Sequence, residues 1–234
     1  MKKMVAVCAL VMVMTIAGTA QSNTFRVVQA KKDVALDTNP NGAFWRGAIP
    51  VYLDVNPFGK PYPAYRTEVL SRWTQDYLYL LYVCPYQKLH LKPNPRTDAE
   101  TFALWNWDVA EIFIGSDFQN IRRYKEFEIS PQGEWVDLDI NLDNPHHTDG
   151  WVWNSGFQVS ARIDREKKIW YGEMKIPFAA IALHAPHPGM VFRVNLFRKE
   201  GSGKEIVPLV WQPTMQETFH VPERFGTMVL AAKE

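Results

Sequence analysis

The sequence contains little cysteine, only Cys8 and Cys84 among 234 residues. Because Cys8 falls in an N-terminal leader, one thiol remains, and one thiol cannot form an internal disulfide. Neither sign of charge is in excess, since 26 lysine and arginine residues accompany 25 aspartate and glutamate residues. This balance gives no long-range attraction to nucleic acid or to anionic lipid. Stability must therefore come from a packed core, which a composition of 47% hydrophobic residues can supply.

Long apolar runs are confined to the N-terminus. Lys2 and Lys3 precede an apolar run over residues 4–16, and small residues follow at Gly18 and Ala20. This pattern is typical of a signal peptide, and the run is too short to cross a bilayer. We expect cleavage near Ala20 and export to the periplasm or the extracellular space. No later segment is apolar over a length that would predict a membrane span.

Helical periodicity is also scarce, whereas short apolar or alternating runs recur between turn residues. Residues 67–73 and 77–84 predict a hairpin, residues 109–115 predict a strand, and "FQVSARI" alternates strictly between apolar and polar. We therefore predict an all-β fold, an antiparallel β-sandwich of immunoglobulin-like or jelly-roll-like type. The predicted organisation is a signal peptide over 1–20, an N-terminal extension over 21–36 and one domain over 37–234.

The stretch "LWNWDVAEIFIG" combines flat rings with a carboxylate in an apolar strand. On that strand Glu111 lies among apolar residues, just after Trp105 and Trp107. A carboxylate partly removed from water needs hydrogen-bond donors or a cation. A sugar offers an apolar C–H face to a ring and hydroxyl donors to a carboxylate, so the stretch is a candidate saccharide site.

Two ordinary explanations compete with that hypothesis. A tryptophan in a β-rich chain is commonly a core residue, and a strand glutamate commonly pairs with an arginine. The sequence offers four arginines as partners for Glu111, namely Arg122, Arg123, Arg162 and Arg193.

The order of several motifs resembles carbohydrate-binding module family 9. These motifs are "RTEVLSRWTQDYLYLLYVCPY", "LWNWDVAEIFIG", "YKEFEIS" and the terminal "FHVPERFGTMVL". The resemblance runs from about Asp37, in "LDTNPNGAFWRGA", to Leu230. It implies a β-sandwich that holds a mono- or disaccharide between two aromatic rings.

Carried over by motif, the resemblance assigns four residues of this sequence to sugar binding. The first ring falls on Trp105, the hydroxyl-binding carboxylate on Glu111, the second ring on Phe219 and a contacting amide on Gln216. Glu128 stands where the family has an arginine that grips hydroxyls, so that donor is lacking here.

A late strand, "FRVNLFRK", supplies two further candidates. Asn195 and Arg198 could complete the polar rim of the site.

Two carboxylates in "WVDLDI" leave other chemistries open. Asp137 and Asp139 fall on one face of a strand, so with Glu111 they could form a glycoside hydrolase site. With Asp143 they could instead bind calcium, which members of the resembled family can carry as a structural ion.

Other residues would suit metal or cofactor chemistry. Met174, Met190 and His220 are candidate axial ligands for a haem-binding electron-transfer domain of the same sandwich class. His146, His147, His184 and His187 lack the spacing typical of a zinc site and are better explained as loop residues.

The sequence thus predicts an exported protein that binds carbohydrate without cleaving it, in polysaccharide capture or carbohydrate catabolism. The expected partners are mono-, di- or polysaccharides, with Ca²⁺ as a candidate ion. Nucleic acid and a membrane span are not expected.

Overall fold

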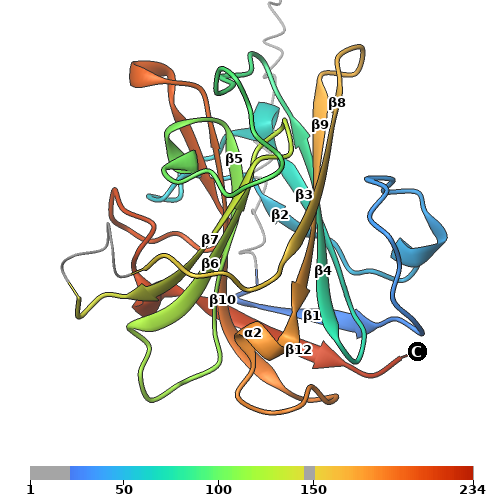
Figure 1. Ribbon diagram of the computed structural model, residues 1–234. Coiled ribbons are helices and arrows are strands. Elements are labelled where there is room, and N and C mark those ends of the chain that lie inside the picture. Colours follow the sequence, from blue (N-terminus) through green and yellow to red (C-terminus); the bar gives the residue numbers. More distant parts are fainter. Residues whose placement is uncertain (1–21, 145–150, 234) are drawn as a thin grey trace, which may run out of the picture.

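The computed structural model describes residues 22–144 and 151–233 (Figure 1). The predicted signal peptide and the candidate ligands His146 and His147 lie outside these residues. Twelve strands form one hydrogen-bonded sheet system, and α2 (Phe178–Ile181) is a single helical turn. The strands are β1 (Thr24–Gln29), β2 (Val51–Leu53), β3 (Thr67–Trp73), β4 (Tyr77–Pro85), β5 (Val109–Gly115), β6 (Arg123–Ile129), β7 (Trp135–Asn141), β8 (Gln158–Asp164), β9 (Ile169–Pro177), β10 (Val191–Glu200), β11 (Val207–Val210) and β12 (Gly226–Ala231).

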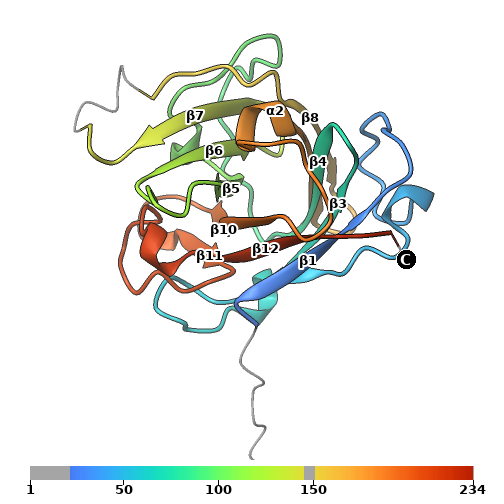
Figure 2. The same cartoon turned by 90° about the horizontal axis from the view of Figure 1, so that it is seen from below.

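The strands form the two layers of a β-sandwich, which confirms the predicted fold class. The order along the sheet system is β7-β6-β5-β10-β12-β1-β3-β4-β9-β8, with β11 beside β10 and β2 beside β3. Strands β7, β6, β5 and β10 make one layer, and β3, β4, β9 and β8 make the other (Figures 1 and 2). Helix α2 packs Phe178 and Ile181 into the core between them.

Strand β1 connects the two layers and departs from the antiparallel pattern. It pairs in parallel with β12, Val27 opposite Leu230, and in parallel with β3, Val28 opposite Arg72. Because β1 falls within residues 21–36, part of the segment predicted as an extension is a strand of the sandwich.

Two predicted turns are present. The β3–β4 hairpin pairs Trp73 with Leu78, and the hydroxyl of Thr74 accepts hydrogen bonds from the backbone N–H groups of Asp76 and Tyr77. Between β6 and β7 the backbone N–H of Gly133 donates to the carbonyl of Ser130 at 3.1 Å. Gly133 has φ +86°, a conformation that glycine adopts without strain.

Alternation along the strands gives the first layer two apolar faces. On β5 the side chains of Ala110, Ile112 and Ile114 enter the core between the layers. Val109 and Phe113 alternate with them and join a second apolar cluster on the opposite face. We call this second face, turned away from the other layer, the outer face.

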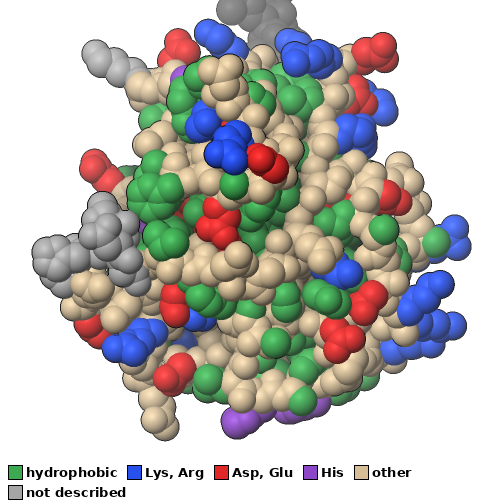
Figure 3. All heavy atoms as spheres, in the orientation of Figure 1, with side chains coloured by type: hydrophobic (Ala, Val, Ile, Leu, Met, Phe, Trp, Pro, Cys, Tyr) green, Lys and Arg blue, Asp and Glu red, His purple; other side chains and the backbone are tan. Residues whose placement is uncertain are grey.

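The described residues also bear on membrane insertion, the remaining thiol and the surface charge. None of their helices is long and apolar enough to span a membrane. The thiol of Cys84 is free and buried. Lysine and arginine side chains are interspersed with aspartate and glutamate over the face drawn in Figure 3, in keeping with the balanced composition.

Candidate functional site

A pocket of about 400 Å³ lies over the outer face of the first layer. Its aromatic lining comes from loops and strands far apart in the chain, namely Phe102, Trp105, Phe113, Trp151, Phe219 and His220. Its charged lining consists of Glu111, Glu126, Lys199 and Glu217. We call this site the aromatic pocket. Its size and mixed lining are those of a small-molecule site.

The loop before β5 places Trp105 in the pocket. Trp105 belongs to the short 3-10 helix Leu104–Asn106, which Leu104 anchors with a fully buried side chain. The indole is half-buried and packs edge-on against Phe102, with ring centroids 5.1 Å apart. Trp107, two residues later, is instead stacked on His90 and lies outside the pocket lining.

A second loop, before β12, brings Phe219 to the same pocket. Its ring is half-buried and stacks on Phe197 of β10, with centroids 4.3 Å apart and an angle of 11° between the planes. His220 stacks on Phe113 of β5 at 5.1 Å, and its Nδ1 lies 2.8 Å from the hydroxyl of Tyr124. This second loop is thus held against β10 and β5 through ring contacts.

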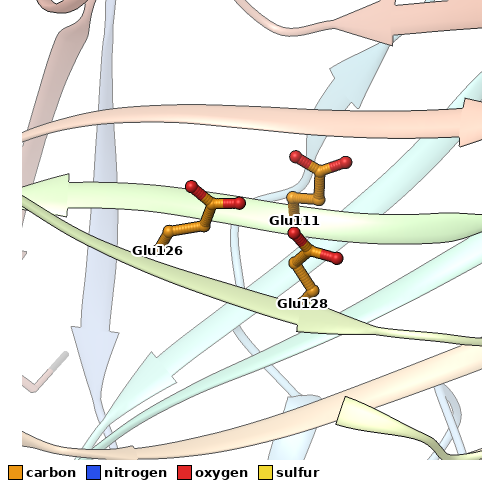
Figure 4. Close-up of side chains that lie close together, drawn as sticks. All are labelled: Glu111, Glu126 and Glu128. Carbon is orange, nitrogen blue, oxygen red and sulfur yellow. The ribbon is translucent and has the colours of Figure 1, made fainter. Parts of the chain in front are cut away.

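Three glutamates from β5 and β6 converge at the base of the pocket. The ladder between these strands places Glu111 opposite Glu128 and Phe113 opposite Glu126. One carboxylate oxygen from each glutamate lies within 4.8 Å of the others. Figure 4 shows the three carboxyl groups on the same side of the sheet. We call Glu111, Glu126 and Glu128 the carboxyl cluster.

The carboxyl cluster is almost completely removed from water, with exposed fractions of 2%, 3% and 0% for Glu111, Glu126 and Glu128. Burial raises the pKa of Glu126 to about 7. Burial and then the neighbouring carboxylates raise the pKa values of Glu111 and Glu128 well above their usual range, and Lys199 opposes this rise. The cluster therefore retains protons at neutral pH.

Among the described residues that line the pocket, Lys199 is the one with an ammonium group. It lines the pocket from β10, and its Nζ donates a hydrogen bond to the backbone carbonyl of Trp105 at 2.7 Å. This bond ties the Trp105 loop to the strand that carries Lys199.

The structure brings together three of the residues assigned by motif, Trp105, Glu111 and Phe219, in one pocket. Gln216 is exposed and outside the pocket lining, and its neighbour Glu217 lines the pocket instead. Glu128, at the position of the family arginine, belongs to the carboxyl cluster but is not among the residues that line the pocket.

The predictions for Asn195 and Arg198 are wrong. Asn195 is fully buried, and its amide donates to the carbonyl of Gln212 at 2.9 Å, so it is not a rim residue. Arg198 alternates with Lys199 on β10 and therefore points away from the pocket. Its guanidinium is fully buried, pairs with Glu200 and donates to the hydroxyl of Thr67.

The aspartates considered for hydrolysis or calcium do not converge. Val136 and Leu138 of β7 belong to the outer face, so Asp137 and Asp139 point to the opposite face from Glu111. Asp137 accepts a hydrogen bond from the backbone N–H of Ser155 at 2.6 Å, and Asp139 pairs with Lys125 at 2.7 Å.

Asp143, the third candidate calcium ligand, pairs with Arg122 at 2.6 Å. Within residues 22–144 and 151–233, the carboxyl cluster is the one group of three acidic, histidine or cysteine side chains close enough to share an ion.

The candidate haem ligands are also separated. Met174 is fully buried in the core between the layers, and Met190 packs against that core. His220 instead lines the pocket on the outer face. His184 and His187 are exposed on the segment after α2.

Sequence reasoning missed several residues of the site, notably Glu126, Trp151, Lys199 and His220. For Glu126 a signal was present, because it shares a strand face with Glu128 in "YKEFEIS". Trp151 and His220 come from loops whose positions no periodicity predicts.

Comparison with known proteins agrees with this architecture. The family model described as carbohydrate family 9 binding domain-like matches residues 42–233. A protein of Arthroderma benhamiae named "Extracellular protein" is 24% identical over 187 residues, which cover 74% of this chain and 81% of that protein.

Solved structures share the fold. A putative carbohydrate-binding protein from Bacteroides uniformis superposes with a TM-score of 0.70 and 16% identity, covering 88% of this chain and 98% of that one. A carbohydrate binding module of family 9 from Caldicellulosiruptor kristjanssonii, in complex with cellotriose, gives a TM-score of 0.66 and 11% identity, covering 90% and 95%. A family 9 module from the same organism in complex with glucose gives a TM-score of 0.64 and 12% identity, covering 90% of this chain and 97% of that one. Since the family model spans most of the sequence, the chain belongs to the carbohydrate family 9 binding domain-like family.

Proposed function

We propose that the protein binds a saccharide in the aromatic pocket and does not cleave it. The observation that carries the proposal is the convergence of Trp105 and Glu111 with Phe219, from a distant segment of the chain, on one pocket of about 400 Å³. The half-buried rings offer flat apolar surfaces to the C–H face of a sugar. The carboxyl groups and the ammonium of Lys199 offer hydrogen bonds to its hydroxyls. Family membership and the complexes of the family 9 modules with cellotriose and glucose support the same ligand class.

Binding without cleavage is the chemistry that the carboxyl cluster favours. Glycoside hydrolysis requires two carboxyl groups in different environments, one protonated and one ionised. Glu111, Glu126 and Glu128 share a single buried environment, and burial shifts all three pKa values in the same direction. Asp137 and Asp139 are on the other face of the sheet and cannot act with them.

The wider role that we propose is that of an exported protein in polysaccharide capture or carbohydrate catabolism. The basic residues and apolar run at the N-terminus support export. The name of the Arthroderma benhamiae relative, "Extracellular protein", agrees with this proposal.

The test is isothermal titration calorimetry of the purified protein with glucose and cellotriose. Trp105→Ala should weaken binding by about 1–3 kcal/mol, because an aromatic platform is lost from the contact surface. Trp107→Ala is the matched control, since this indole is two residues away but stacked on His90 outside the pocket. Equal affinities of the two variants, or no binding of any saccharide by the unmodified protein, would contradict the proposal.

A further inference from the structure

The charged groups at the pocket base carry an excess of acid over base. Three carboxyl groups meet there, whereas Lys199 is the one lysine or arginine among the described lining residues. Its Nζ already donates to the carbonyl of Trp105. Glu217 adds a fourth carboxylate to the lining. A cationic ligand that enters this pocket therefore meets four carboxyl groups, which can ionise in its presence, and a single cationic side chain.

The carboxyl cluster also lacks hydrogen-bond donors. Three oxygens of the cluster are buried and accept no hydrogen bond from any other described residue, namely both carboxyl oxygens of Glu128 and Oε2 of Glu126. The carboxyl groups of Glu126 and Glu128 can hydrogen-bond to each other by sharing a proton. A buried carboxylate without donors is strongly unfavourable. A sugar hydroxyl supplies one donor and no charge, whereas an ammonium group supplies three donors and a positive charge.

The walls of the pocket favour the same kind of group. Four aromatic side chains line the cavity, those of Trp105, Trp151, Phe113 and Phe219. Aromatic faces attract cations through their quadrupole, and rings combined with carboxylates are the usual environment of a recognised ammonium group.

From these observations we infer that the aromatic pocket selects a saccharide bearing a free amine, with the ammonium group placed over Glu111 and Glu126. The inference deepens the proposed function and depends on it, since it names the class of sugar that the same site binds. Glu128 is the third carboxyl group of the cluster and is not among the residues that line the pocket.

A divalent metal ion is the competing occupant, and the surroundings favour it less. Calcium takes six to eight oxygen ligands, whereas the groups next to the carboxyl cluster are rings and an ammonium. The nearby carbonyl of Trp105 is already bonded to Lys199. An organic ammonium needs no such shell and tolerates the rings.

The experiment compares three probes that differ at one carbon. D-Glucosamine carries an ammonium at C2, D-glucose a hydroxyl and N-acetyl-D-glucosamine a neutral amide. Calorimetry with the full purified protein at neutral pH should show glucosamine binding at least about tenfold more tightly than either of the others. Binding should also release protons from the carboxyl cluster, measured as a dependence of the observed heat on the buffer's protonation enthalpy. This second measurement requires no variant.

Variants test whether the preference for glucosamine arises from the carboxyl cluster. Glu126→Gln should lower the affinity for glucosamine by more than the affinity for glucose, so that most of the preference for glucosamine is lost. Glu68→Gln on β3, in the other layer, is the matched control and should leave the preference unchanged.

Failure of the inference is distinguishable from failure of the proposed function. If glucose binds as tightly as glucosamine, the inference is overturned and the proposed function stands. If none of the probes nor cellotriose binds, both are overturned. If saccharide binding requires added calcium and is abolished by a chelator, the carboxyl cluster is a metal site and the inference is likewise overturned.

Discussion

Replacing Glu126 with glutamine should stabilise the protein above neutral pH and leave its stability nearly unchanged in mild acid. In the folded protein, burial raises the pKa of Glu126 from 4.5 to about 7. In the unfolded chain the carboxyl is in water and ionises at its usual pH. Folding therefore requires this carboxyl either to hold a proton or to be buried as an anion.

The sign and the size of the effect follow from that difference. A carboxyl whose folded pKa is raised contributes its full stability below the unfolded pKa of 4.5, and this contribution is lost as the pH rises through about 7. The difference between the two pKa values corresponds to about 3 kcal/mol. Glutamine resembles the protonated acid in size and carries no charge at any pH, so the variant avoids this loss.

The assay is urea denaturation of the unmodified protein and of Glu126→Gln at about pH 5 and about pH 8. The free energies of unfolding should be similar at the lower pH, and the variant should be more stable by about 3 kcal/mol at the higher pH. Glu68→Gln controls for a glutamate-to-glutamine change outside the cluster. A difference between Glu126→Gln and the unmodified protein that is the same at both pH values would refute the reasoning, because the cluster would then hold no extra proton.

Three further outcomes are expected. Arg198→Met should lower the free energy of unfolding by about 3–5 kcal/mol, measured by urea denaturation, because it leaves Glu200 buried without its cation. Saccharide binding should persist in this variant, since Arg198 points away from the pocket. Gly226→Ala should destabilise by about 1–3 kcal/mol, measured in the same way, because a Cβ there would lie 2.4 Å from the Trp211 ring and 2.6 Å from the carbonyl of Asn23. The affinity for glucosamine, measured by calorimetry, should rise between about pH 5 and about pH 7, because the carboxyl cluster ionises over this range beside Lys199, Glu217 and His220. An affinity that falls over this range would contradict the inferred contact between the ammonium group and the cluster.

The fold was largely predictable because its strands carry strong local signals. The Thr67–Trp73 and Tyr77–Pro85 hairpin was bounded by turn chemistry, and the alternation in "FQVSARI" indicated a half-buried strand. Strand β1 was less accessible, since its pairing with β12 joins residues about 200 positions apart and no local pattern encodes such contacts.

Strand parity explains which site residues were misplaced. Asn195 and Arg198 are three positions apart, so on a strand they point to opposite faces and cannot share one rim. The odd or even position of a residue does not by itself show whether its side chain points to the core or to the outer face, because β5 and β10 are apolar on both faces. Asp137 and Asp139 do share one face of β7. Because Val136 and Leu138 alternate with them and lie on the outer face, the two aspartates point to the opposite face.

The carboxyl cluster could not be predicted from sequence because it depends on the β5–β6 register. Glu111 and Glu128 are 17 residues apart, and only their pairing across the ladder brings their carboxyl groups together. A shift of one residue would have placed Glu111 opposite Phe127 and separated the acids onto different faces.

The position of the carboxyl cluster connects the stability of the fold with its recognition of ligands. Three adjacent buried carboxyls without arginine oppose folding, and apolar residues of similar size at the same positions would stabilise the sandwich. Nothing in the packing of the outer face requires acids there, because Val109 and Phe113 on β5 and Tyr124 on β6 already form its apolar contacts. A ligand that brings donors and positive charge to Glu111 and Glu126 would offset the unfavourable burial, since a molecule that binds only the folded state stabilises it by an amount that grows with the ratio of its concentration to its Kd. The groups that weaken the empty protein are therefore those from which a cationic sugar would gain the most.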